Sequence, residues 1–81
     1  MLTTYKYVDT IYAIEHIIEM ERSEESTCIG HFNSESEVYA ECKGYGWSRE
    51  RVADMSGTRC GHGESLEIIE CSDHLFVYYQ K

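Results

Sequence analysis

Proline is absent from this 81-residue sequence, and so are internal repeats and low-complexity segments. Such features mark linkers and repeat arrays, so nothing in the sequence indicates a second domain. A chain of this length buries only about 60 to 65% of the surface that its unfolded form exposes, which leaves little room for a deeply enclosed substrate cleft. We therefore expect one domain over residues 1–81 that works by binding rather than by catalysis.

Long apolar runs are also lacking, because no stretch approaches the roughly 18 apolar residues of a membrane-spanning helix. The first residues show no basic region followed by an apolar run and a cleavage site. Four cysteines are too few for a disulfide scaffold, and no two have the Cys-x-x-Cys spacing of common zinc sites. We expect reduced thiols and a cytoplasmic location, without contact with a membrane.

Basic residues are scarce: seven lysines and arginines face 15 acidic residues, and the net charge is −8 at pH 7. This balance disfavours direct contact with nucleic acid and favours a partner protein with a basic surface. The alternative is that the charge only keeps a small protein soluble. Between residues 19 and 41, seven acidic residues accompany Arg22 as the single basic residue, and we expect them to form an acidic face: Glu19, Glu21, Glu24, Glu25, Glu35, Glu37 and Glu41.

The N-terminal segment fits two structures. Residues 5–20 are rich in β-branched and aromatic residues, so a strand is the preferred interpretation. If residues 15 to 21 are extended, Glu15, Glu19 and Glu21 line one face. This row of carboxylates either imitates a nucleic-acid backbone or is only the solvated polar face of an ordinary sheet. A helix over residues 9–22 stays open, because four apolar residues recur at helical spacing: Tyr7, Ile11, Ile14 and Ile18.

The middle of the chain contains a clear helix signal. A short strand is expected at residues 27 to 32, and Ser34 and Glu37 then form a capping box. The helix should run for about ten residues, with Val38 and Cys42 facing the core and Gly44 ending it in a left-handed conformation. Residues 44 to 63 are interpreted as a long loop, in which Trp47 is either a core anchor, the favoured choice, or an interface hot spot.

The C-terminal residues 64–79 predict a hairpin that turns at Ser72 and Asp73 and pairs Glu70 with Leu75. One face of the hairpin should pack under the helix: Leu66, Ile68, Leu75, Val77 and Tyr79. The other face is also apolar, and we expect the N-terminal segment to cover it, although a partner or a second copy is an alternative: Ile69, Phe76 and Tyr78. The whole predicts a small α+β, ββαββ-like domain, an antiparallel sheet with one main helix.

Histidines close to cysteines are the only candidates for chemistry. Cys28 and His31 would point to opposite faces of an extended strand, so they should not share a metal. A zinc site, the alternative to a protein without cofactor, would use residues from the last loop and across the hairpin turn: Cys60, His62, Cys71 and His74. Cys60 and His62 also suggest a nucleophile pair, but no third group orients the base, so we do not expect an enzyme.

Three features cover about two thirds of the chain: an N-terminal strand pair, the stretch from His31 to Ala40 entering a short helix, and the hairpin from Leu66 to Tyr79. In this architecture and in its acidity the chain resembles small phage accessory proteins of the anti-CRISPR type. The resemblance implies a bacterial host cell and tight binding to a host nuclease or other defence complex whose nucleic-acid site is blocked by acidic side chains. The glutamates named above would supply the charge. Three aromatic residues would anchor the partner: Tyr45, Trp47 and Phe76.

Overall fold

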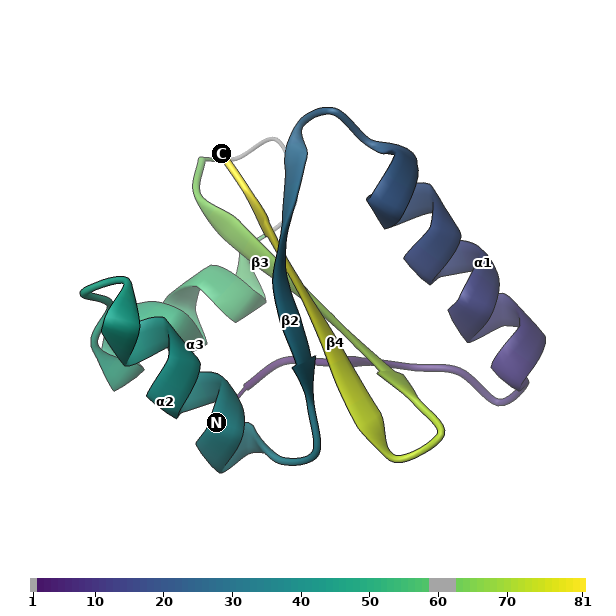
Figure 1. Ribbon diagram of the computed structural model, residues 1–81, viewed down its shortest axis with the longest axis horizontal. Coiled ribbons are helices and arrows are strands. Elements are labelled where there is room, and N and C mark those ends of the chain that lie inside the picture. The colour runs from purple at the N-terminus through teal and green to yellow at the C-terminus, as the bar shows by residue number, and fades with distance from the viewer. Residues whose placement is uncertain (1, 59–62) are drawn as a thin grey trace.

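The computed structural model describes residues 2–58 and 63–81. Within these residues the chain forms a small α+β fold, as expected, but not the ββαββ order (Figure 1). The elements in chain order are β1 (Tyr5–Lys6), α1 (Thr10–Arg22), β2 (Ser26–Phe32), α2 (Glu35–Gly44), α3 (Arg49–Gly57), β3 (Ser65–Cys71) and β4 (His74–Gln80). The strands lie in the order β1-β3-β4-β2, and the sheet is mixed because β1 runs parallel to β3 while the other pairs are antiparallel.

Helices cover both faces of this sheet: α2 and α3 lie on one side and α1 on the other (Figure 1). The larger core lies between the sheet and the α2–α3 layer, and it includes Val38, Val52, Ile68 and Val77, all fully buried. A smaller core lies under α1. It contains Ala13, Met20, Ile69 and Tyr78.

The preferred strand prediction for the N-terminal segment is wrong, and the helical alternative is right. Asp9 caps the helix by accepting a hydrogen bond from the Ile11 amide at 3.0 Å. The second face of the hairpin needs apolar cover, and a helix supplies it by placing Ala13 and Met20 on one side. In the described part of the chain, neither α1 nor another helix is both long and apolar enough to cross a membrane.

The hairpin forms as predicted. Glu70 pairs with Leu75, and the turn residues Ser72 and Asp73 both have positive φ, at 50° and 64°. Two consecutive positive φ angles are the mark of a tight type I′ turn, which matches the right-handed twist of its strands. The predicted cover of the second hairpin face by the N-terminal segment is also confirmed.

The helix after Ser34 is confirmed, with its hydroxyl accepting from the Glu37 amide at 3.4 Å and with Cys42 fully buried. Its predicted end is wrong in detail, because Gly44 is the last helical residue and the left-handed conformation falls on Gly46, at a φ of 83°. The long-loop prediction is wrong as well. Ser48 caps α3 there by accepting from the Arg51 amide at 3.1 Å.

A β-bulge interrupts β2. Cys28 pairs with Tyr78 and Gly30 with Val77, so Ile29 is an extra residue without its own partner. Gly30 has a φ of 150°, and a Cβ at this position would lie 2.8 Å from the Phe32 ring, so the ring fills the place of a side chain. A one-residue insertion reverses the facing of the residues that follow it.

The bulge overturns the prediction that Cys28 and His31 face apart. His31 pairs with Phe76, and Phe76 lies on the same sheet face as Tyr78, the partner of Cys28. Both side chains therefore stand on the face that α1 covers.

Candidate functional site

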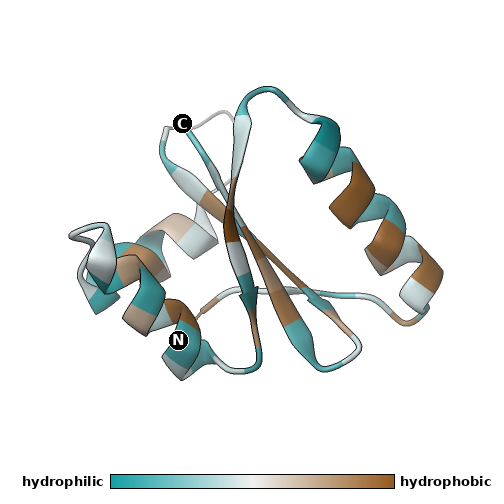
Figure 2. Cartoon of the chain, in the orientation of Figure 1, coloured by the Kyte–Doolittle hydropathy of each residue, from teal (hydrophilic) through white to brown (hydrophobic). Residues whose placement is uncertain are grey.

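The outer side of α1 is the most apolar exposed surface among the described residues. Ile11, Ile14 and Ile18 are 62%, 45% and 42% exposed, and their spacing of three and four residues aligns them on one side of the helix. We call these three residues the α1 stripe. Val8, just before the helix, and Tyr12 are also exposed. Figure 2 shows apolar bands along α1 that alternate with hydrophilic ones.

Carboxylates flank the α1 stripe. Glu15 and Glu19 are one helical turn apart, about 6 Å along the axis. They line an open hollow of ≈ 530 Å³ toward the end of the helix together with Ile18, Arg22 and Ser23. The expected row of three carboxylates does not form, because Glu21 is two residues beyond Glu19 and therefore about 200° around the helix. Of the three glutamates expected in one row, only Glu15 and Glu19 therefore share a face of α1.

The seven glutamates of the expected acidic face separate into two groups. Glu19 and Glu21 belong to α1, Glu24 and Glu25 to the turn after it, and Glu35, Glu37 and Glu41 to α2. Since α1 and α2 lie on opposite sides of the sheet, one partner surface of ordinary size would contact one group only.

The three expected aromatic anchors also lie apart. Trp47 is partly buried and packs against the larger core, as the favoured interpretation had it. Its ring stacks on exposed Tyr45, with centroids 5.0 Å apart. Phe76 is on the other sheet face, 4.3 Å from the His31 ring, and packs under the α1 layer.

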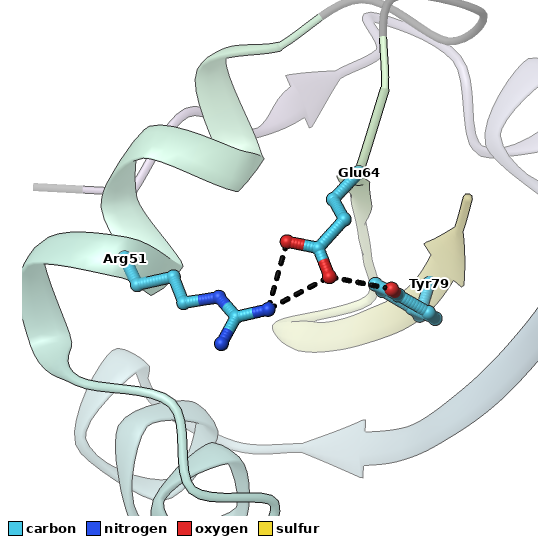
Figure 3. Close-up of polar contacts among 3 residues, drawn as sticks. All are labelled: Arg51, Glu64 and Tyr79. Carbon is cyan, nitrogen blue, oxygen red and sulfur yellow. Dashed lines mark hydrogen bonds and ion pairs between the residues drawn. The ribbon is translucent and has the colours of Figure 1, made fainter.

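A polar network joins α3 to the ends of β3 and β4 (Figure 3). Arg51 donates to both carboxylate oxygens of Glu64 at 2.7 and 2.8 Å, and the Tyr79 hydroxyl donates to Glu64 Oε1 at 2.9 Å. These hydrogen bonds, Arg51 first, lower the pKa of Glu64, and the bond to Glu64 raises the pKa of Tyr79. The network holds α3 against the sheet.

A second network links a tyrosine, a histidine and a glutamate under the N-terminal end of α1. His16 Nε2 lies 2.8 Å from Glu67 Oε2, and its Nδ1 lies 2.6 Å from the Tyr7 hydroxyl. In the neutral imidazole Nε2 donates to the carboxylate and Nδ1 accepts from Tyr7. Burial, with the charges of Glu67 and Glu19, raises the pKa of Tyr7. A nucleophilic tyrosine needs a lowered pKa, so this network does not indicate Tyr7 as a nucleophile.

The cysteine and histidine candidates have different fates. Cys71 and His74 pair across the hairpin turn as expected, while Cys60 and His62 lie outside the described residues. Elsewhere the structure brings together a group that the sequence reasoning had excluded: ligand atoms of Glu21, Cys28 and His31 all lie within 4.8 Å of one another. Gly30 inside a strand pattern was the signal for the bulge that unites them.

Comparison with known proteins adds no relative: no protein-family model, curated protein or solved structure matches this chain. The structure itself defines the class as a small, acidic three-layer α+β domain with one apolar, acid-flanked helix on its outside.

Proposed function

We propose that this protein binds a basic partner protein through the outer side of α1. Its more specific form, in line with the resemblance to anti-CRISPR proteins, is inhibition of a host nucleic-acid-handling complex by covering its nucleic-acid site. The exposure of the α1 stripe beside Glu15 and Glu19 carries the proposal. Apolar residues spaced three and four apart on a free helix face are what a groove in a partner recognises.

Charge selects the partner. The chain carries a net charge of −8, so a second copy or an anionic membrane brought against α1 would meet like charges. Glu24 and Glu25, in the turn that follows α1, extend the negative edge toward β2. A partner with an apolar groove and a basic rim complements this surface in both respects. Nucleic-acid sites of nucleases are basic for the same electrostatic reason.

The test begins with a photo-crosslinking residue in place of Ile14, compared with one in place of Glu41 on α2. We expect a specific crosslinked partner only from position 14. Binding to that partner is then measured by calorimetry for the pairs Ile11→Ser with Ile18→Ser and Glu15→Lys with Glu19→Lys. Each pair should weaken binding by at least about tenfold, as hot-spot losses do, and the affinity should fall as salt rises. The control Glu41→Lys should bind as the wild type does.

Two outcomes oppose the proposal. Wild-type affinity in both α1 variants would remove α1 as the binding surface, and a loss confined to Glu41→Lys would move the surface to α2. For the inhibitory form, the crosslinked partner must be a nucleic-acid-handling protein whose activity declines with stoichiometric addition of the wild type and not of the α1 variants.

A further inference from the structure

Glu21, Cys28 and His31 offer three different ligand atoms at one place: a carboxylate oxygen, a thiol sulfur and an imidazole nitrogen. Their mutual separations reach at most 4.8 Å. Ligand bonds of about 2.0 to 2.3 Å in a tetrahedral zinc site place neighbouring ligand atoms roughly 3.3 to 3.8 Å apart. The three side chains are exposed, so small rotations about their χ angles can close the remaining ångström.

The backbone produces this convergence from two elements. Glu21 is in the last turn of α1, and the connection of residues 23–25 returns the chain directly into β2. The bulge at Ile29 then brings Cys28 and His31 onto the sheet face that α1 covers. Without the bulge, residues 28 and 31 would face apart, and Glu21 would have one neighbour instead of two.

Tyr78 supplies an independent observation. It lies directly opposite Cys28 on β4 and is fully buried, yet among the described residues its hydroxyl makes no well-formed hydrogen bond, only a weak one to Glu21. The last turn of α1 brings the Glu21 carboxylate within 4.8 Å of the Cys28 sulfur, on the sheet face where Tyr78 lies opposite Cys28. Carboxylates that bind metals are themselves usually held by a hydrogen bond from a neighbouring group. The Tyr78 hydroxyl is a donor in the right place to hold Glu21.

We propose that Glu21, Cys28 and His31 bind one divalent cation of the zinc class, with Tyr78 as the donor that positions Glu21. Thiolate and imidazole ligands select zinc-like ions over magnesium and calcium, which prefer oxygen. Binding replaces the thiol proton of Cys28, which passes to solvent, by a sulfur–metal bond. Three protein ligands leave a fourth position for water, as in open zinc sites. The ion would fasten the C-terminal end of α1 to β2.

Cobalt(II) is the probe, because a cobalt–thiolate bond gives a charge-transfer absorption in the near ultraviolet. Metal-free, reduced full-length protein is titrated with cobalt(II) and then with zinc(II). We expect the absorption to saturate at one equivalent of cobalt and to disappear as zinc displaces it. Cys28→Ser and His31→Ala should abolish the absorption, and Glu21→Gln should weaken cobalt binding. The matched control Cys71→Ser changes the other partly accessible thiol among the described residues and should behave as the wild type.

Tyr78→Phe separates a positioning role from a merely structural one. Metal-free Tyr78→Phe should be about as stable as the wild type, because the change removes a buried hydroxyl that makes no well-formed hydrogen bond. Its zinc affinity should nevertheless fall by about 10-fold to 100-fold, as for other groups that support a ligand. Unchanged zinc affinity would remove Tyr78 from the site.

The cation site itself fails if wild-type protein shows no cobalt–thiolate absorption at a several-fold excess of cobalt. It also fails if the absorption survives in Cys28→Ser and is lost in Cys71→Ser, which would assign the ion to the hairpin turn. If a variant does not fold, the wild type is titrated with zinc(II) and its amide chemical shifts are followed by NMR. The proposed site requires that the signals of residues 21, 28, 31 and 78 shift first. These residues are not the α1 stripe, so this result and the partner-binding result are independent.

Discussion

Replacing Gly30 by alanine should destabilise the protein, because the bulge in β2 depends on a backbone conformation that other residues rarely adopt. The φ of 150° lies in the region that only glycine enters readily, and holding another residue there costs about 1 to 3 kcal/mol. The added Cβ would also meet the Phe32 ring at 2.8 Å. The ring can swing away, but it then gives up part of its packing against the larger core, so the backbone cost is the minimum.

For a domain of this size, each kcal/mol lowers the midpoint of thermal unfolding by about 4 to 8 °C, so Gly30→Ala should unfold about 4 to 24 °C below the wild type. Circular dichroism during heating measures this shift. Gly44→Ala is the matched control, because Gly44 is helical and nothing lies within 4 Å of an added Cβ. It should be neutral or stabilise by up to about 1 kcal/mol. Equal midpoints for Gly30→Ala and the wild type would refute the argument that glycine sustains the bulge.

Three further predictions concern the fold. Ile69→Ala should lower the free energy of unfolding in urea by about 2 to 5 kcal/mol, since Ile69 is fully buried under α1. Ile11→Ala on the α1 stripe should change it by no more than about 0.5 kcal/mol. Similar losses in the two variants would mean that α1 packs on the sheet by another face. Ser34→Ala should cost about 1 kcal/mol through loss of the helix cap, and an unchanged unfolding midpoint would contradict the capping hydrogen bond. The hydrogen bonds from Arg51 lower the pKa of Glu64 in the folded protein. The wild type should therefore lose stability relative to Glu64→Gln as the pH falls from about 4.3 through the folded-state pKa of Glu64. An NMR titration that finds an ordinary pKa for Glu64 would exclude this prediction.

Local signals explain the parts of the fold that were predictable. The hairpin turn at Ser72 and Asp73 allows only two residues between its strands, so it determines the register and with it both faces of the sheet. The capping box at Ser34 likewise acts within one helical turn. Neither signal needs information from distant parts of the chain, and both predictions are confirmed.

The N-terminal segment was ambiguous because its decisive contacts are distant. Isoleucine and tyrosine favour strands locally, and the helical spacing of the same residues was equally visible. Tertiary packing decides: Ala13 and Met20 cover a hairpin face formed more than 40 residues later in the chain. The acidic row depended on the extended alternative and failed with it.

The helix α3 was missed because its apolar signal is weak. Val52 and Met55 are its buried apolar residues, three apart, and the glycines on either side suggested a loop. Ser48 as a cap was the available indication. The Glu21, Cys28 and His31 group was missed for a different reason: strict alternation was assumed along β2, although an isolated glycine in a strand often marks a bulge.

The order of the strands has a consequence for the growing chain on the ribosome. Both central strands, β3 and β4, lie within residues 65–80, after every helix of the described chain, and β1 and β2 pair with no other strand among the described residues. Until that hairpin emerges, α1 and α2 have no sheet to pack against, and β2 has no strand beside it. We therefore expect the nascent chain to stay unfolded until residues 65–80 have emerged and then to fold in one cooperative step around the hairpin.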